Sequence, residues 1–258
     1  MMLLATVAAL ATLQGTTQGA DFRWNGTLAA GKTVEIKGIN GAIRAEGTSG
    51  RQVEVVARKT SRRSDVESVE IKVVEHADGV TVCAVYPNQS GEGCDLSSRS
   101  GGRNRSGNND NNDVSVEFTV RVPSGVHFVG HTVNGDARAS GITGDAEVST
   151  VNGSVLVEAA GNAEGHTVNG DVEVSMGRTD PEGPIEVETV NGNVIVTLTG
   201  TPNLDVRART TNGDIETDFP LTVKGRFGPR TLTGTIGSGG KSLTLGTVNG
   251  DIRIRRRA

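Results

Sequence analysis

The stretch Thr167-Val168-Asn169-Gly170-Asp171-Val172-Glu173-Val174 decides the fold of this 258-residue chain, because copies of it return from the middle of the sequence to its last line. Close copies begin at Thr132, Thr150, Thr189, Thr210 and Thr247, and a worn copy, Thr231-Leu232-Thr233-Gly234-Thr235-Ile236, fills the one long gap. Counted at the Asn position, the spacings are 18, 17, 22, 21, 21 and 16 residues. A repeat in this range is typical of a solenoid, in which each repeat buries its apolar face only by stacking on its neighbours.

Asn-Gly between β-rich segments usually indicates a two-residue hairpin, but the distribution of apolar residues argues against one here. A hairpin would send Glu173 to the core side, whereas an extended chain places Val168, Gly170 and Val172 on one face. We therefore predict that the motif lies in, or gently bends, a strand of a parallel stack, with Gly facing inward and Asn and Thr facing outward. A left-handed Asn at a sharp solenoid corner is the competing geometry.

The outward Asn and Asp side chains of the motif form a candidate surface ladder. The residue after each Gly alternates between acid and neutral along the chain: Asp136, Ser154, Asp171, Asn193, Asp214, Thr235, Asp251. Adjacent strands lie about 4.8 Å apart, so this alternation avoids a repulsion of roughly 1 kcal/mol between neighbouring charges. It also argues against a calcium ladder, which needs converging carboxylates. The candidate ladder residues are Asn134, Asn152, Asn169, Asn191, Asn212, Asn249, Asp136, Asp171, Asp214 and Asp251.

The first half of the chain predicts longer, less regular strands. Period-2 alternation occurs at 33–37, 52–57, 69–73, 80–85 and 114–122, and residues 38–45 resemble an early copy of the repeat. We expect an all-β protein: a single-chain parallel β-solenoid, similar to a β-helix, with a less regular N-terminal β cap. The predicted organisation is a signal peptide at 1–20, an N-terminal β region at 21–125, and a repeat solenoid at 126–258.

The start of the sequence favours export. Residues 1–13 are uncharged and apolar but too short to span a bilayer, which indicates a secretory signal peptide rather than an anchor. The competing interpretation is an apolar tail on a cytosolic protein. In an exported chain, Cys83 and Cys94 most simply form one disulfide, the alternatives being free thiols or a metal pair. The polar segment at about 88–113 predicts a disordered surface loop, or else a recognition loop.

Composition excludes several functional classes. Aromatic residues make up 3% of the chain, so a ring-stacking ligand site is poorly supplied. The net charge of −4 argues against nucleic acid as a partner, and the basic residues 253–257 fit a charged cap on the last strand.

Residues 26–33 match a phosphate-binding loop, but a strand follows where that loop needs a helix. The histidines His76, His127, His131 and His166 lack metal-ligand spacing. We predict no catalytic, cofactor-binding or metal-binding residues.

The repeated Thr-Val-Asn-Gly-Asp, the early 38–41 copy, the 83–87 segment and the 120–125 entry into the repeats resemble the bacterial putative-adhesin family of β-strand-repeat proteins of unknown function. The sequence is also similar to the head domains of putative autotransporter adhesins. The resemblance covers residues 30–257 and implies a secreted or envelope-associated β-solenoid, without catalytic residues to carry over.

From the sequence we expect a non-enzymatic, exported β-solenoid that binds a cell surface, a glycan or an envelope protein, located in the periplasm, at the cell surface or outside the cell. It would have no cofactor, no nucleic-acid partner and no transmembrane anchor. One alternative is a structural or sensory envelope scaffold that acts through protein partners at the ends of the stack. A β-helix carbohydrate-active enzyme is a further alternative, and an ice-binding solenoid fits the uneven repeat lengths poorly.

Overall fold

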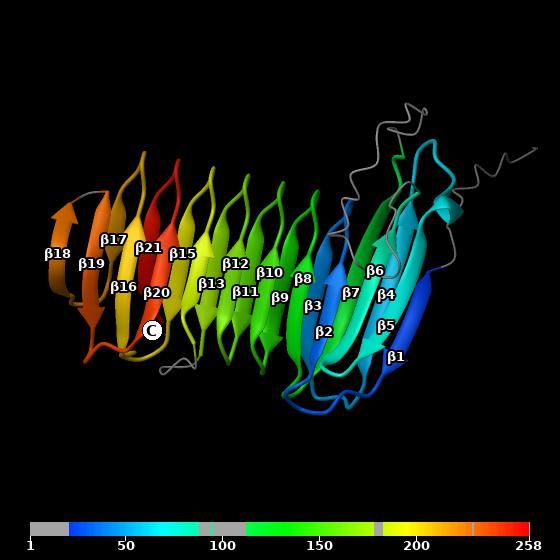
Figure 1. Ribbon diagram of the computed structural model, residues 1–258, viewed down its shortest axis with the longest axis horizontal. Coiled ribbons are helices and arrows are strands. Elements are labelled where there is room, and N and C mark those ends of the chain that lie inside the picture. The colour runs from blue at the N-terminus through cyan, green and yellow to red at the C-terminus, as the bar shows by residue number, and fades with distance from the viewer. Residues whose placement is uncertain (1–20, 88–93, 95–111, 178–182, 229, 258) are drawn as a thin grey trace, which may run out of the picture.

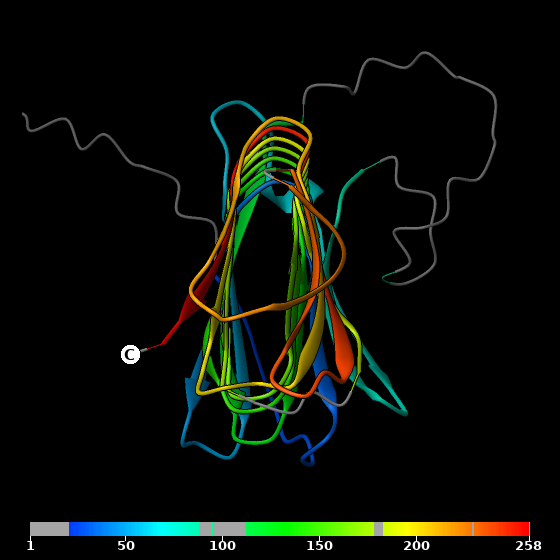
Figure 2. The ribbon, with the colours of Figure 1, turned by 90° about the vertical axis from the view of Figure 1, so that its left-hand side faces the viewer.

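The computed structural model describes residues 21–87, 94, 112–177, 183–228 and 230–257. These residues form two β-sheets that face each other across a thin core, together with one short 3-10 helix, η1 (Val66–Ser68). Figure 1 shows the strands side by side along the long axis, and the end-on view in Figure 2 shows the narrow, flattened section of the stack.

Sheet A is the ten-stranded sheet, and its strands run in the spatial order β1-β4-β7-β3-β9-β11-β13-β15-β21-β17. Its members in chain order are β1 (Phe22–Gly26), β3 (Ile43–Thr48), β4 (Val53–Thr60), β7 (Ser115–Pro123), β9 (Ala137–Ile142), β11 (Val155–Ala159), β13 (Val172–Met176), β15 (Val194–Leu198), β17 (Ile215–Thr217) and β21 (Ile252–Arg256).

Sheet B is the eleven-stranded sheet, in the spatial order β18-β19-β16-β20-β14-β12-β10-β8-β2-β6-β5. Its members in chain order are β2 (Thr33–Lys37), β5 (Glu70–His76), β6 (Gly79–Val85), β8 (His127–His131), β10 (Ala146–Ser149), β12 (Ala163–His166), β14 (Ile185–Glu188), β16 (Leu204–Arg209), β18 (Thr222–Gly228), β19 (Thr231–Ile236) and β20 (Lys241–Gly246).

Each repeat forms one coil, which consists of a strand in sheet B, a bend, and a strand in sheet A. Successive coils pair in parallel; for example, β12 pairs with β10, and β13 pairs with β11. Parallel neighbours need a crossover, and here the opposite sheet supplies it. The predicted all-β parallel solenoid is therefore confirmed.

The core lies between the two sheets because alternate residues of every strand point inward. On β13, Val172, Val174 and Met176 are buried, while Glu173 is exposed. The facing strand β12 contributes Ala163 and Gly165, and a side chain at Gly165 would collide with Val172. In this coil, large residues on β13 thus pack against small residues on β12, which lets the two sheets approach closely here.

The coils are not stacked in chain order. The last coil, β20 and β21, lies between the β14/β15 coil and the β16/β17 coil. At the other end, the first coil, β2 and β3, lies between β6/β7 and β8/β9. The earliest and latest repeats are therefore internal to the stack.

The N-terminal end departs from the parallel pattern, as predicted for a less regular β cap. β4 pairs antiparallel with β7 and β1, and β5 pairs antiparallel with β6. The predicted domain boundary at 125/126 stays a prediction. Strands from the two sides of it belong to the same sheets, since β2 pairs with β8 and β3 pairs with β9. No helix among the described residues is long and apolar enough to cross a membrane.

The disulfide between Cys83 and Cys94 is present, with Cα atoms 5.5 Å apart, and confirms the predicted pairing. It ties Cys94 to the buried strand β6. The signal peptide predicted at 1–20 lies outside the described residues, as does most of the loop predicted at 88–113, of which the structure describes Cys94, Asn112 and Asp113.

Candidate functional site

The Thr-Val-Asn-Gly motif forms the bend between the two sheets and does not lie within a strand. In each coil the strand of sheet B ends before Thr, and the strand of sheet A begins two residues after Gly, as at β12 and β13. We call this bend the motif corner. The prediction that the chain runs extended through the motif is wrong. The alternative, which placed the motif at a corner of the solenoid, is correct about where the motif lies. The tight arcs at the top of Figure 2 are these corners.

Glycine rather than asparagine makes the turn. Gly170 has φ +150°, in the region that favours glycine, and its counterparts lie between +124° and +156°. A side chain at Gly170 would also overlap the carbonyl of Gly153 in the coil before it. The predicted reason for this residue, that no side chain fits and the backbone must bend, therefore holds, but the predicted left-handed Asn does not.

The threonine of each corner is buried, which contradicts its predicted outward orientation. Thr167 is 6% exposed, and its hydroxyl donates a hydrogen bond of 2.9 Å to the carbonyl of Gly153. The same bond, at 2.9–3.0 Å, joins each neighbouring coil to the next. The donors are Thr132, Thr150, Thr189, Thr247 and Thr210. These hydroxyls pair glycine carbonyls at the closed end of the core.

The asparagines form a continuous outward ladder. The Asn169 Nδ2 donates to Asn152 Oδ1 at 2.9 Å, and Asn191 Nδ2 donates in turn to Asn169 Oδ1. Bonds of 2.7–2.9 Å link all seven members in the order Asn40, Asn134, Asn152, Asn169, Asn191, Asn249, Asn212. The backbone is paired as well, since Asn152 N donates to Val133 O. The ladder is therefore part of the structure; whether it binds a ligand stays a prediction.

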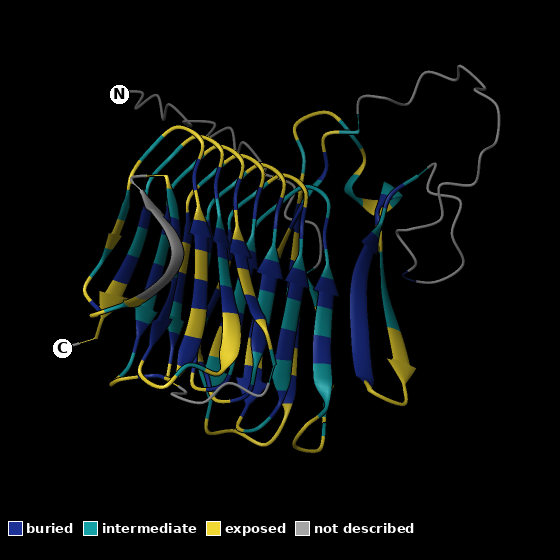
Figure 3. Ribbon diagram, turned by 60° about the vertical axis from the view of Figure 1, so that its left-hand side comes forward, coloured by how far each residue is buried: buried dark blue, intermediate teal, exposed yellow. Residues whose placement is uncertain are grey.

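The valines of the motif face solvent, which contradicts the prediction that they point into the core. Val133, Val151, Val168, Val190 and Val248 are the large apolar side chains exposed at the corners, at 37–41%. They stand in a row beside the asparagine ladder. We call the two rows together, with Thr211 in the position of a valine, the corner ridge; its exposed residues form the yellow arcs along the upper edge in Figure 3. The bend reverses the alternation, so the residue before Asn turns outward.

Most neighbours in the row of residues after each Gly are also linked from coil to coil. Ser154 N donates to Asp136 Oδ1, and Asn193 N donates to Asp171 Oδ1. Since the last coil is inserted, the spatial order is Asp136, Ser154, Asp171, Asn193, Asp251, Asp214, and the alternation predicted from chain order fails at its end.

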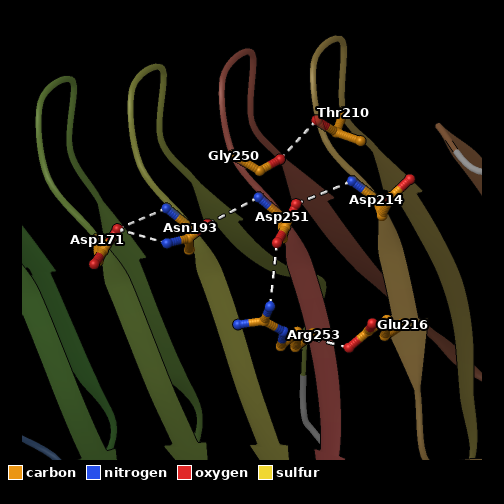
Figure 4. Close-up of polar contacts among 8 residues, drawn as sticks. All are labelled: Asp171, Asn193, Thr210, Asp214, Glu216, Gly250, Asp251 and Arg253. Carbon is orange, nitrogen blue, oxygen red and sulfur yellow. Dashed lines mark hydrogen bonds and ion pairs between the residues drawn. The ribbon is translucent and has the colours of Figure 1, made fainter.

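Two acids are thus neighbours at the end of this row, and an arginine compensates for them. Asp214 N donates to Asp251 Oδ1 at 3.1 Å. The Arg253 guanidinium contacts Asp251 Oδ2 at 3.1 Å and Glu216 Oε2 at 3.3 Å (Figure 4). Arg253 lies on β21 itself, so the inserted strand brings the cation that its own aspartate needs.

The worn copy at 231–236 is not a motif corner, and the prediction that it fills a gap in the repeats is wrong. It forms β19, which runs antiparallel to β16, with Thr233 opposite Arg207. Without Asn it joins no ladder, and Gly234 has no positive φ. The hairpin of β18 and β19 ends sheet B instead.

The histidines predicted to be strand-edge residues lie on the outer face of sheet B. His131 and His166 flank Ser149 in one cross-strand row, and His131 Nδ1 lies 2.6 Å from Ser149 Oγ. Within the described part of the chain, no group of three His, Cys, Asp or Glu residues could hold a metal ion. That the protein has no catalytic, cofactor or metal residues stays a prediction.

The next cross-strand row on this face is acidic. Glu147 pairs directly with Glu164, and Glu186 follows on the next strand. Partial burial, and then the charges of Glu147, Glu186 and Asp145, raise the pKa of Glu164. Burial and then Glu186 raise the pKa of Glu188, which the charge of His166 partly offsets.

Sequence reasoning missed the exposed valines of the corner ridge. One signal was present: in the copy that begins at Thr210, Thr211 replaces the valine. A polar residue at one member of a repeated apolar position indicates that the position is not in the core.

Comparison with known proteins identifies one family, and several solved structures match, including two distant ones. The profile of the family described as Toastrack DUF4097 matches residues 4–255. A putative cell adhesion protein from Clostridium sporogenes aligns at 14% identity and a TM-score of 0.46, covering 92% of this chain and all of that one. A putative adhesin from Bacteroides fragilis aligns at 10% identity and a TM-score of 0.26, covering 91% of this chain and 97% of that one. The curated proteins contain no significant match.

Proposed function

The chain belongs to the Toastrack DUF4097 family, and from this premise we propose that it is a non-enzymatic, exported β-solenoid that binds a component of a cell surface or envelope. The observation that carries the proposal is the corner ridge. Five valines at 37–41% exposure lie in one row, and exposed apolar side chains gathered on one surface favour a contact with a partner.

The ridge is suited to binding because it is held rigidly. Each coil is fixed to the next at the corner by an Asn–Asn bond, a Thr–Gly bond and backbone bonds. A surface that is ordered before contact loses little entropy when a partner binds. Each ladder amide has a second N–H, which makes no bond within the described residues and could donate to that partner.

The disulfide supports the proposed location. Cys83 and Cys94 are bonded, and disulfides persist in oxidising compartments outside the cytosol. Export therefore accounts for a bond that a reducing compartment would remove.

The valines, rather than the asparagines, are the residues to test. Asn169 holds two ladder bonds, so replacing it would disturb the fold as well as the surface. Threonine is compatible with the valine position, since Thr211 already occupies it. A variant with Val133→Thr, Val151→Thr and Val168→Thr therefore makes the ridge polar and keeps the corner.

Binding of the labelled protein to envelope preparations tests the proposal. If each lost methyl contributes about 0.8 kcal/mol when buried, the triple variant binds about tenfold to a hundredfold more weakly. Val74→Thr is the matched control, because Val74 is 38% exposed on β5, away from the ridge. Equal binding by the triple variant and the wild type would contradict the role of the ridge, and turnover of a polysaccharide by the purified protein would contradict the non-enzymatic assignment.

A further inference from the structure

A groove of about 640 Å³ lies on the outer face of sheet B, where β14, β20, β16 and β19 adjoin, just below the corner ridge. Val190 and Val248 of the ridge form its rim. Its volume is in the range of ligand-binding clefts, about 300–1,000 Å³. The cross-strand order of its residues explains both its shape and its charge.

A missing side chain opens the groove. In one cross-strand row, Glu188 lies beside Gly246, Gly246 beside Arg209, and Arg209 beside Thr231. A Cβ at Gly246 would lie 3.1 Å from Glu188 Oε1, so a larger residue would fill the space between Glu188 and Arg209. Two strand spacings, or about 9.6 Å, separate the backbones on either side of this gap.

One wall of the groove carries two unpaired cations. Arg207 and Arg209 are two residues apart on β16, both exposed on the outer face. Neither makes an ion pair or a side-chain hydrogen bond with the residues that the structure describes. Both guanidinium groups are therefore available to an anionic ligand.

Hydroxyl groups surround these two arginines. Thr233 and Thr244 flank Arg207 on β19 and β20, and Thr231 flanks Arg209. A threonine hydroxyl can donate one hydrogen bond and accept others, so it matches a sugar hydroxyl in either sense. Apart from these residues and Glu188, the lining consists of threonine, valine, alanine, leucine and glycine. A ligand would thus be held by charge and hydrogen bonds.

We propose that this groove binds an acidic glycan, whose carboxylates contact Arg207 and Arg209 and whose hydroxyls bond to Thr231, Thr233 and Thr244. A guanidinium binds a carboxylate through two parallel hydrogen bonds, which gives the contact direction as well as strength. Glu188 on the opposite wall accepts hydrogen bonds from sugar hydroxyls, and its charge repels additional carboxylates of the ligand. The inference rests on the proposed surface-binding function and names the class of its ligand.

The probe is an oligomer of galacturonic acid, and the matched probe is the galactose oligomer of the same linkage, which carries a neutral hydroxymethyl group in place of each carboxylate. Calorimetric titration of the whole protein is expected to show binding of the acidic oligomer and at least tenfold weaker binding of the neutral one. Arg207→Gln with Arg209→Gln is expected to weaken binding of the acidic oligomer by about tenfold or more, since it removes charge-assisted bonds.

Two further variants separate the groove from general charge effects. Arg255→Gln removes an exposed charge from the outer face of sheet A, opposite Thr197, and leaves the affinity unchanged. Glu188→Gln removes a negative charge from the groove and raises the affinity for the acidic oligomer. Thermal unfolding of each variant verifies that it is folded.

Three results would overturn the inference: no binding of the galacturonate oligomer by the wild type, equal binding by the double arginine variant, or tighter binding of a single-stranded oligonucleotide. The two proposals fail separately. If envelope binding depends on the ridge valines and the groove variants change nothing, the proposed function stands and the glycan site is rejected. If the groove binds the glycan but the ridge variants do not affect envelope binding, the glycan site stands and the role of the ridge is rejected.

Discussion

The buried threonine is the residue that most directly links one coil to the next. The Thr167 hydroxyl donates a hydrogen bond to the carbonyl of Gly153. Among the described residues, this carbonyl accepts no other hydrogen bond. Gly153 is half-buried, and a carbonyl shielded from water without a partner loses hydration free energy that can exceed the net contribution of a bond. The hydroxyl therefore stabilises the corner in two ways: it forms a hydrogen bond, and it keeps the carbonyl from being left without a partner.

Replacing Thr167 with Val should lower the free energy of unfolding by about 1–3 kcal/mol, because the shape is kept and the carbonyl is left unpaired. Denaturant titration measures this change. Thr211→Val makes the same chemical change at an exposed position where other coils already carry valine, and should leave stability within about 0.5 kcal/mol of the wild type. Equal stability of Thr167→Val and the wild type would show that the bond is dispensable.

At this scale the sequence predicted which residues matter but not all of their orientations. The Asn ladder and the need for Gly follow from the repeat. The orientations of Thr167 and Val168 do not, because alternation along an extended chain assigns them to the wrong sides. Alternation assumes a straight strand, and the positive φ of Gly170 places a bend where that assumption fails.

At the level of elements, the outer face of sheet B divides into an acidic part and a basic part. Glu147, Glu164 and Glu186 succeed one another on β10, β12 and β14, whereas Arg207 and Arg209 lie on β16. Like charges directly opposite on neighbouring strands destabilise a sheet by roughly 0.2–1 kcal/mol. The central strand of the acidic part, β12, therefore carries the largest electrostatic cost.

Glu164→Gln should stabilise the protein at neutral pH. Burial and the surrounding acids raise the pKa of Glu164 in the folded state above its ordinary value of 4.5, so the folded protein binds the proton more tightly than the unfolded chain. Stability is then lost as pH rises through the window above 4.5, and the full penalty applies at neutral pH. Removing the charge should recover about 0.2–1 kcal/mol.

Thermal unfolding as a function of pH measures this effect. The gain from Glu164→Gln should shrink as the pH falls toward 4.5 and be absent well below it, where Glu164 is protonated in both states. Glu173→Gln on β13 is the control, because its cross-strand neighbours are the uncharged Leu156 and Ile195. A gain that does not depend on pH would mean that charge repulsion is not its cause.

Most of the strands follow from the sequence, and the exception has a physical reason. The segment 33–37 coincides with β2, and the other alternating segments match their strands to within a few residues. The worn copy at Thr233 has the spacing and apolar pattern of a repeat but lacks the Asn that bonds to neighbouring corners. Periodicity identified it as a strand, whereas its antiparallel pairing with β16 is a long-range contact that periodicity does not specify.

At the level of the whole molecule, stability should follow spatial neighbours rather than chain neighbours. In a solenoid each coil is stabilised mainly by the coils on either side of it. The coil of β16 and β17 meets the rest of the stack through β20 and β21, the last coil in the chain. The sequence does not predict this order, because the copy at Asn249 carries the same bonding groups as every other copy and fits any position in the ladder.

Truncation after Gly240 removes β20 and β21 and should therefore release β16 to β19 from the stack, while β8 to β13 stay folded. Amide hydrogen exchange should show lost protection in β16–β19 and retained protection in β8–β13. Truncation after Arg256, which keeps the whole of β21, is the matched control. Full protection of β16–β19 in the shorter chain would show that these strands dock directly on β14 and β15, contrary to the role assigned to the last coil.

The inserted last coil also limits how this protein can change in length. Both edges of β20 and β21 are already paired, so a further repeat joined after β21 would find no free strand edge to extend. The stack ends elsewhere, at β17 in sheet A and at the β18–β19 hairpin in sheet B, and at β1 and β5 on the opposite side. A longer ridge therefore follows most directly from duplication of an interior repeat, which would lengthen both sheets by one strand and leave the strands at the two ends as they are.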